Sequence, residues 1–339
     1  MQFFQMAEDE HMKRVAFNGF GRIGRQVFKL LIDDPGMEIV AINNTSGGAI
    51  ARHLLKYDST YGTYNRNVSV DGDFLVVGDK RVRILTERDP SKLPWRQSGV
   101  DVVIENTGVF TKREECQKHI DAGAKKVLLT APGKNMDLTV VKGVNEHWYD
   151  PKKHHIISNA SCTTNCLAPM VKVLQDNFGI EKGFMVTIHA MTNDQSILDQ
   201  SHKDFRRART AITSIIPTTT GAAIAVAEVI PELKGKLDGL AYRVPVVTGS
   251  IVEFTAELRQ DVDVEKIKWL FKSVAEHELS GIIQYTEEPI VSVDIIGNSH
   301  SCIFDAPLAK AMGKLVKLAG WYDNEWGYSC RVADIAHML

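Results

Sequence analysis

Three glycines near the start of the chain constrain its fold more than any other feature. Gly19, Gly21 and Gly24 form a GxGxxG motif between an apolar strand pattern at residues 13–17 and an amphipathic helix pattern at residues 23–32. Glycine permits the tight turn and close backbone approach that a dinucleotide pyrophosphate needs, and the helix N-terminus attracts the anion. A glycine-rich turn that binds no ligand can have the same sequence, but the flanking strand and helix patterns favour a dinucleotide site.

The first half of the chain extends this pattern. Its strands and helices alternate, which predicts an α/β fold class with a Rossmann-type doubly wound parallel sheet. Gly78-Asp79 separates two strand patterns that we expect to form an antiparallel pair. Strand patterns lie at residues 13–17, 38–43, 73–77, 80–85, 100–105, 126–129 and 153–157, and helix patterns at residues 23–32, 50–56 and 112–121.

The second half has longer strand patterns that alternate in hydropathy, and it predicts an α+β domain with a mixed or antiparallel sheet. We place the domains at residues 13–161 and 162–324, preceded by a disordered or tag-like extension at residues 1–12, with the native start at Met1 or Met12. Strand patterns lie at residues 185–189, 240–247, 251–258, 290–293 and 316–321, and helix patterns at residues 167–178, 222–229 and 264–278.

A cysteine stands where one of these helices is expected to begin. Cys162 lies in the run SNASCTTNC at residues 158–166, between a strand pattern and a helix pattern. Unpaired N–H groups and the positive end of the helix dipole favour the thiolate, which is the nucleophilic form of cysteine. The alternative is a buried cysteine that acts as a small hydrophobe.

Composition excludes several function classes. The chain has 339 residues, a net charge of -2 and five cysteines. The charge argues against nucleic-acid and membrane binding, and no apolar run is long enough to span a membrane. An odd number of scattered cysteines indicates reduced thiols and a cytoplasmic protein. Cys162 and Cys166 have no matching ligands elsewhere, so we expect no metal site.

Five segments together resemble one family, the phosphorylating glyceraldehyde-3-phosphate dehydrogenases. The resemblance runs from about residue 13 to the C-terminus, and the SNASCTTN segment is specific to this family and to the related erythrose-4-phosphate dehydrogenases. The segments are residues 18–25, 158–166, 189, 216–223 and 321–329.

The resemblance implies a reaction and its two central residues. The activity would be reversible oxidation of glyceraldehyde 3-phosphate to 1,3-bisphosphoglycerate with NAD(P)⁺ and inorganic phosphate. Cys162 matches the nucleophile that forms a hemithioacetal and then a thioacyl intermediate, and His189 matches the base. It also implies a catalytic domain at residues 162–324, a last helix at about 325–339 that returns to the NAD(P)-binding domain, and a homotetramer.

The resemblance assigns the remaining site residues by ligand. Cofactor-binding positions are Gly19, Gly21, Arg22, Ile23, Gly24, Asn44, Arg88, Thr130 and Asn324. The substrate phosphate would be held by Thr192 and Arg243, and inorganic phosphate by Ser161, Thr163, Arg207, Thr220 and Gly221. Thr220 and Gly221 also open an expected helix, whose N-terminus suits an anion.

Two features bear on the choice between NAD and NADP. Asn44 ends the second strand, where a carboxylate would repel a 2′-phosphate, and Thr45 and Ser46 add hydroxyl donors. Many NAD-specific members of the family carry Leu-Pro where this chain has Gln200-Ser201, and Ser201 can donate to a phosphate. The sequence therefore permits NADP without excluding NAD.

Two alternative functions remain open. Erythrose-4-phosphate dehydrogenase is the rival enzyme, although residues 218–223 (TTTGAA) resemble the triose enzymes more closely. A regulatory protein that binds cofactor or RNA without turnover would be expected to lack the nucleophile or the base, and this chain has both.

Overall fold

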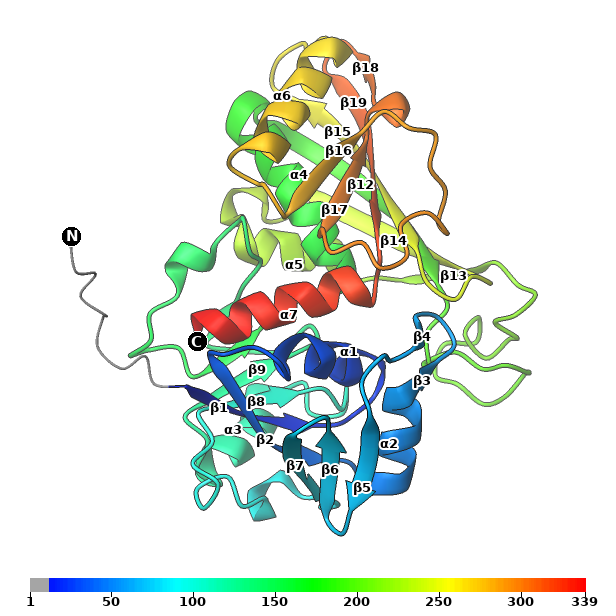
Figure 1. The fold of residues 1–339 in the computed structure, drawn as a ribbon. Coiled ribbons are helices and arrows are strands. Elements are labelled where there is room, and N and C mark those ends of the chain that lie inside the picture. The colour runs from blue at the N-terminus through cyan, green and yellow to red at the C-terminus, as the bar shows by residue number, and fades with distance from the viewer. Residues whose placement is uncertain (1–11) are drawn as a thin grey trace, which may run out of the picture.

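The computed structural model describes residues 12–339, which build two large β-sheets with helices between them (Figure 1). The expected extension at residues 1–12 lies, apart from Met12, outside the described residues. Within the described part of the chain, no helix is both long enough and apolar enough to cross a membrane.

The first sheet confirms the doubly wound α/β prediction. Its nine strands are β1 (Lys13–Asn18), β2 (Met37–Asn43), β5 (Val68–Asp71), β6 (Phe74–Val77), β7 (Lys80–Leu85), β8 (Val102–Glu105), β9 (Lys126–Leu129), β10 (Leu138–Thr139) and β11 (Ile156–Ser158). They run in the order β10-β11-β9-β8-β1-β2-β7-β6-β5. All pairs from β10 to β7 are parallel. β6 and β7 form the antiparallel pair expected around Gly78, and β5, which was not expected, adds to β6 in the same sense.

Helices cover both faces of this sheet because alternate residues of its strands are apolar on both sides. Phe17 on β1 joins a core that holds helix residues Phe28 and Val332, whereas its neighbour Ala16 faces a second core around Trp95. The C-terminal helix α7 therefore packs beside α1, between the two sheets (Figure 1). These helices are α1 (Arg22–Leu31), α2 (Gly48–Lys56), α3 (Arg113–Asp121) and α7 (Trp326–Met338).

The second sheet is mixed, as predicted. Its strands are β12 (Ile180–Ala190), β13 (Ile216–Thr219), β14 (Leu237–Val244), β15 (Ser250–Leu258), β16 (Ile283–Thr286), β17 (Cys302–Asp305), β18 (Lys310–Met312) and β19 (Leu315–Tyr322). The order is β13-β14-β12-β15-β19-β17-β16, with β18 beside β19. The pairs β12/β14 and β16/β17 are parallel, and the others are antiparallel.

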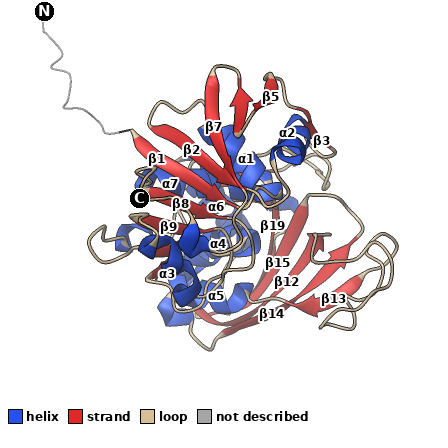
Figure 2. Ribbon diagram, turned by 90° about the horizontal axis from the view of Figure 1, so that it is seen from below, coloured by secondary structure: helices blue, strands red, loops and turns tan. Residues whose placement is uncertain are grey.

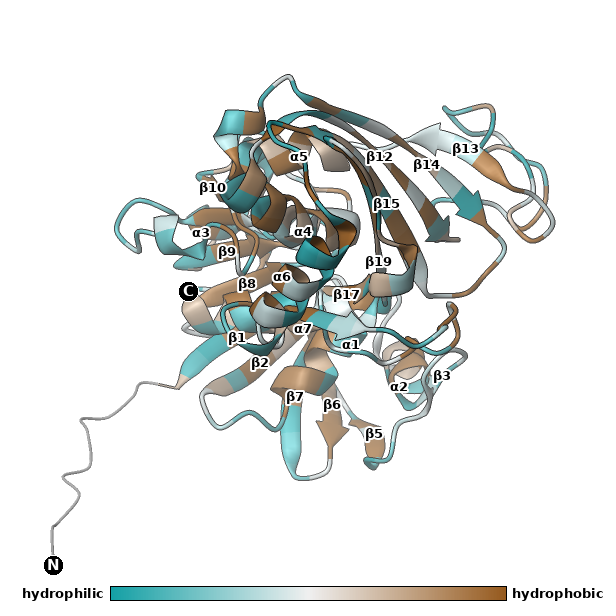
Figure 3. Cartoon of the chain, turned by 90° about the horizontal axis from the view of Figure 1, so that it is seen from above, coloured by the Kyte–Doolittle hydropathy of each residue, from teal (hydrophilic) through white to brown (hydrophobic). Residues whose placement is uncertain are grey.

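One face of the second sheet is covered by three helices (Figure 2), and apolar residues dominate the inner strands of both sheets (Figure 3). Met185 on β12 faces that core, whereas the preceding residue, Phe184, points to the other face of the sheet and is 66% exposed. The sheet therefore has one open side that carries apolar residues. The covering helices are α4 (Cys162–Phe178), α5 (Ala222–Val229) and α6 (Val264–Glu276).

The prediction of a strand at residues 290–293 is wrong, because these residues form a loop. Its alternating apolar side chains, Val291 and Val293, are 54% and 67% exposed, and the Val291 N–H bonds locally to Asp294. The expectation missed β13, β16 and β17, which are too short to give a periodic signal. Minor elements are β3 (Tyr57–Asp58), β4 (Gly62–Thr63) and the 3₁₀ turns Pro90–Lys92, Glu146–Trp148, Pro231–Leu233 and Ala306–Leu308.

Candidate active site

A cavity of about 710 Å³ lies between the two sheets. Eight residues singled out from the sequence line this cavity, four from residues 13–161 and four from residues 162–324. They are Arg22, Ile23, Thr130, Ser161, Cys162, His189, Thr192 and Asn324. Thus the topology brings the end of β9, the starts of α1 and α4 and the end of β12 to one place.

Cys162 is the first residue of α4, as its sequence context predicts. Ser161 caps the helix, because its hydroxyl oxygen accepts a hydrogen bond from the Thr164 N–H at 3.1 Å. The preceding residue, Ala160, has a φ of 53°, so the chain turns sharply into the helix. The turn leaves the Cys162 sulfur at the cavity wall, 3.4 Å from Nε2 of His189.

The other ring nitrogen of His189 has two close neighbours. Nδ1 lies 2.7 Å from the Ala190 carbonyl oxygen and 2.7 Å from Nη1 of Arg243. With a proton, Nδ1 donates to the carbonyl; without one, it accepts from the guanidinium. Burial, together with the Arg243 charge, lowers the pKa of His189 to about 3, so the ring is neutral near pH 7.

The pKa of Cys162 departs from the expectation of a thiolate. Burial raises the pKa of this thiol, and it outweighs the lowering by Arg243 and by hydrogen bonds with Thr163. A helix N-terminus stabilises an anion by a limited amount, whereas desolvation of a buried sulfur acts on its whole charge. Burial thus disfavours the charged form of both side chains, the thiolate of Cys162 and the imidazolium of His189.

This histidine should make the stability of the protein depend on pH. The ring is neutral in the fold but takes up a proton below about pH 6.5 in the unfolded chain, so acid favours unfolding by about 1.4 kcal/mol per pH unit. Between pH 7 and pH 5, the free energy of unfolding should therefore fall by about 2 kcal/mol more in the wild type than in His189→Asn. Urea unfolding at both pH values and one protein concentration measures this difference; equal losses would contradict it.

Arg243 lies beside His189 and does not line the cavity. Its side chain is largely buried, Nη1 faces His189 and Ala190, and Nε is buried without a hydrogen-bond partner among the described residues. A buried guanidinium N–H without an acceptor is costly, and a phosphate oxygen is a strong acceptor for it. The sequence assigned this arginine by resemblance alone, and the structure brings it against His189.

Four other residues expected at phosphate sites lie outside the cavity lining, and three of them have hydrogen-bond partners within the protein. Arg207 is ion-paired with Asp194 and donates to the Thr218 hydroxyl at 2.8 Å, so an anion there would compete with a carboxylate. The Thr163 hydroxyl is within 2.9 Å of the buried Tyr322 hydroxyl, away from the cavity. Gly221 caps α5 without a side-chain hydrogen bond, and the Thr220 hydroxyl accepts from the Ala222 N–H. None of these four expected residues lines the cavity itself.

The glycine loop fits a dinucleotide pyrophosphate. Gly19 has a φ of +93°, and a Cβ there would lie 2.8 Å from the Thr107 nitrogen. A Cβ on Gly24 would meet the Gly19 carbonyl oxygen at 2.8 Å, whereas one on Gly21 would meet open space. Gly21 also caps α1 without a side-chain bond, so the first N–H groups of the helix are available to an anion.

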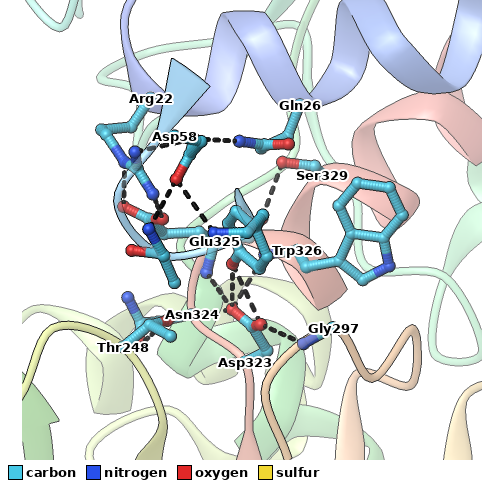
Figure 4. Close-up of polar contacts among 12 residues, drawn as sticks. Arg22, Gln26, Asp58, Thr248, Gly297, Asp323, Asn324, Glu325, Trp326 and Ser329 are labelled. Atoms are coloured by element: carbon cyan, nitrogen blue, oxygen red, sulfur yellow. Dashed lines mark hydrogen bonds and ion pairs between the residues drawn. The ribbon is translucent and has the colours of Figure 1, made fainter. Parts of the chain in front are cut away.

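The Arg22 side chain is committed elsewhere (Figure 4). Its guanidinium is ion-paired with Glu325, to which Nε donates at 2.8 Å, and with Asp58 at 2.8 Å. Asp58 is held in turn by Gln26 at 2.9 Å. Sequence reasoning did not predict this network, which ties the start of α1 to the segment before α7. It leaves the backbone N–H of Arg22, not its side chain, for the pyrophosphate.

The orientation of the Asn324 amide is determined by its neighbours. Its oxygen accepts from the Gly249 N–H at 3.1 Å and from the Ser250 hydroxyl at 2.9 Å, and a backbone N–H can only donate. The amide nitrogen is thus left for the cavity. The Ser250 oxygen also accepts from the Ala190 N–H at 3.0 Å, which joins Asn324 to the strand that carries the base. Sequence reasoning missed Ser250, because only the pairing of β12 with β15 gives it this role.

The residues expected to select the cofactor lie outside the cavity lining. Asn44 follows β2 and donates to the Gly47 carbonyl oxygen at 3.1 Å, as a turn residue does. Thr45, Ser46, Arg88 and Ser201 are all exposed. Among the described residues, no group of three or more His, Cys, Asp or Glu side chains is arranged to hold a metal ion.

Comparisons with known proteins agree over nearly the whole chain. Residues 13–113 match the family model described as glyceraldehyde 3-phosphate dehydrogenase, NAD binding domain, and residues 161–324 match the model of the C-terminal domain. The chain is 56% identical to a glyceraldehyde-3-phosphate dehydrogenase of Geobacillus stearothermophilus over 324 residues, covering 95% of this chain and 97% of the relative. It is 55% identical over 325 residues to one from Streptomyces coelicolor, with the same coverage of both chains.

Proposed function

The chain belongs to the glyceraldehyde 3-phosphate dehydrogenase family, and on that premise we propose that it oxidises glyceraldehyde 3-phosphate reversibly to 1,3-bisphosphoglycerate. The reaction uses inorganic phosphate and an NAD-type dinucleotide. The observation that carries the proposal is the Cys162–His189 pair, whose sulfur and Nε2 are 3.4 Å apart in a cavity that also reaches the glycine-loop helix.

The first bond forms between Cys162 and the aldehyde carbon. His189 is neutral near pH 7 because its pKa is about 3, so Nε2 can take the thiol proton as the sulfur attacks. The protonated ring then returns this proton to the former carbonyl oxygen, which gives a hemithioacetal with a hydroxyl group on Cys162 and leaves His189 neutral again. His189 also accepts the proton of this hydroxyl when the carbon is oxidised, which leaves a thioacyl group on the sulfur. Attack by inorganic phosphate releases the acyl phosphate and restores the thiol.

The substrate phosphate and inorganic phosphate are anions, which cationic side chains and helix N-termini can bind. Arg243 and Thr192 would hold the substrate phosphate, a role supported by the unpartnered Nε of Arg243. A bound phosphate would also draw Arg243 away from His189 Nδ1 and favour donation by that nitrogen to the Ala190 carbonyl. Inorganic phosphate would be held by residues of two helix starts and one arginine, namely Ser161, Thr163, Thr220, Gly221 and Arg207.

The dinucleotide supplies the oxidant, because its nicotinamide ring accepts a hydride. The chain's own residues hold and orient it. The first N–H groups of α1, at Arg22 and Ile23, would bind the pyrophosphate, and the free amide nitrogen of Asn324 would donate to the carboxamide oxygen. Thr130 lines the same cavity, and Asn44 and Arg88 would lie on the adenosine side.

Steady-state kinetics test this function. Purified protein should turn over glyceraldehyde 3-phosphate only when both a dinucleotide and inorganic phosphate are present. Erythrose 4-phosphate should be a much poorer substrate; a higher kcat/KM for it would favour erythrose-4-phosphate dehydrogenase. Cofactor binding without phosphate-dependent turnover of either sugar would contradict both activities.

We propose that NADP is accepted beside NAD, and Asn44→Asp tests the position that would allow it. A carboxylate at residue 44 would repel the 2′-phosphate and accept from the ribose hydroxyls, so the ratio of kcat/KM for NAD⁺ over NADP⁺ should rise about tenfold or more. Asn177→Asp, the same change at an exposed residue near the end of α4, is the control and should leave the ratio unchanged. An unchanged ratio in Asn44→Asp would mean that another position selects the cofactor, with Ser46 and Ser201 the next to test.

We also propose that the protein assembles as a homotetramer in the cytoplasm. The loop at residues 191–215 exposes Ile197, Leu198, Phe205 and Ile215, by 69–88% of their surface, and the second sheet exposes Phe184. Apolar surface of this kind is usually covered by a partner. All five cysteines are free, which suits a reducing compartment. Light scattering during size-exclusion chromatography should give four times the chain mass; a monomer would refute the assembly.

A further inference from the structure

A fully buried carboxylate lies beneath the glycine loop. Glu105 ends β8 and is completely inaccessible to solvent. One of its oxygens accepts from the Asn18 amide at 2.6 Å and lies 3.0 Å from Nε2 of His119, which is also completely buried. The other oxygen accepts from the N–H of Thr107 at 2.8 Å and from its hydroxyl. The catalytic proposal uses none of these four residues.

The first chain of hydrogen bonds leading to Glu105 has a determined direction. It starts at the backbone of Glu87, whose N–H donates to the Asn43 amide oxygen at 2.9 Å and whose carbonyl accepts from the Asn43 nitrogen at 2.7 Å. Since backbone groups cannot exchange roles, Asn43 must donate to the Asn18 oxygen, at 2.7 Å. That leaves the Asn18 nitrogen to donate to Glu105.

The second chain is equally constrained. The indole N–H of Trp95, which can only donate, lies 2.9 Å from Nδ1 of His119. Nδ1 is therefore the bare nitrogen, and the neutral ring carries its proton on Nε2, where it donates to Glu105. Every partner of the carboxyl group thus presents a donor. Only a group that accepts at both of its terminal atoms satisfies all these donors, and a glutamine side chain accepts at one of them alone.

These donors stand on both sides of the first glycine. Asn18 directly precedes Gly19, and Thr107 lies against it, since a Cβ on Gly19 would be 2.8 Å from the Thr107 nitrogen. The backbone agrees with the side chains: the Asn106 N–H donates to the Asn18 carbonyl at 2.7 Å. One carboxylate therefore holds the end of β1 and the segment after β8 at the spacing in which the glycine loop fits between them.

We propose that Glu105 is a positioning residue for the dinucleotide, one that sets the shape of the glycine loop before the pyrophosphate arrives. It touches neither the cofactor nor the reacting atoms. Its carboxylate, through Asn18 and Thr107, presents the first N–H groups of α1 at the geometry that binds the anion. The proposal rests on the dinucleotide-binding role proposed above, and it extends that role to a residue buried behind the site.

Glu105→Gln is the sharpest test, because it keeps the volume and removes one acceptor. Its amide nitrogen must face either the Thr107 donors or those of Asn18 and His119, so one side of the loop loses its bonds. The KM for NAD⁺, and the dissociation constant for NAD⁺ measured by titration calorimetry on the assembled protein, should rise about 10- to 100-fold. The kcat at saturating NAD⁺ should stay within about threefold, because Cys162 and His189 are untouched.

Two further variants separate positioning from stability. Val103→Ala creates a cavity on the same strand, at a fully buried side chain that bonds to neither Asn18 nor Thr107. It should lower Tm and leave the KM for NAD⁺ unchanged. Thr107→Val removes one donor to Glu105 at constant shape, and it should raise that KM by a smaller factor than Glu105→Gln.

The proposal is overturned if folded Glu105→Gln binds NAD⁺ as tightly as the wild type does. It is also overturned if Glu105→Gln changes kcat and KM only as much as Val103→Ala does. If Glu105→Gln does not fold, Thr107→Val decides by the same measurement. Calorimetry reads binding without turnover, so a wild type that binds NAD⁺ but oxidises no sugar phosphate would refute the proposed reaction and leave this test intact.

Discussion

Cys162→Ser is expected to lower kcat for glyceraldehyde 3-phosphate oxidation by on the order of 10⁴-fold or more, because a serine hydroxyl at this place is a far weaker nucleophile. His189 lies 3.4 Å from the sulfur, and a thiol gives up its proton to such a base far more readily than a hydroxyl does. The dissociation constant for NAD⁺ should change little, since the glycine loop and Asn324 keep their contacts.

The chain provides a matched control for this substitution. Cys166 lies one turn further along α4, is completely buried, and its thiol faces the Gly320 carbonyl at 3.6 Å. Cys166→Ser should keep kcat within a few-fold of the wild type. Mass spectrometry of protein incubated with aldehyde and NAD⁺, without phosphate, should find the acyl group on Cys162 only. Retained turnover in Cys162→Ser, or an acyl group on another side chain, would remove Cys162 from this role.

His189→Asn is expected to lower kcat by about 10²- to 10⁴-fold, the usual contribution of a positioned base. Burial and Arg243 keep the pKa of the wild-type imidazole near 3, so the ring is uncharged across the neutral range. Without it, the thiol of Cys162, whose pKa burial raises, has no base at Nε2. Activity of the variant should therefore increase toward high pH more steeply than that of the wild type.

The control for the histidine is His155→Asn, an exposed residue beside β11. It should leave both kcat and the pH profile unchanged. The KM for NAD⁺ in His189→Asn should also stay within a few-fold, because the base makes no contact with the glycine loop. A pH profile in His189→Asn that parallels the wild type would mean that another group accepts the proton.

Much of the fold was predictable because its signals are local. The GxGxxG turn, the β/α alternation and the switch to longer amphipathic strands each depend on a few neighbouring residues, and the structure has both predicted sheets. Where the local signal was misleading, the prediction failed. Residues 290–293 alternate in hydropathy but have no strand beside them, and β17 was missed although its four residues are completely or nearly completely buried.

The candidate site divides in the same way. Cys162 at a helix start and the glycines at a turn were visible in the sequence, because the chemistry of each depends on its own position along the chain. The surroundings of the thiol were not: burial raises the pKa of Cys162, against the effect expected of the helix end. The commitment of Arg22 to Asp58 and Glu325 was not visible either, since its partners are far away in sequence.

The sequence by itself determined which elements form and which residue types stand at their ends, since backbone geometry and hydropathy act over a few residues. Only the tertiary structure decided what those end residues face. Strand pairing and the return of α7 bring together His189 and Arg243, Asn324 and Ser250, and Glu105 and Asn18. Hydrogen bonds and desolvation act over a few ångströms of space rather than along the chain, so protonation, amide orientation and loop shape follow from the fold.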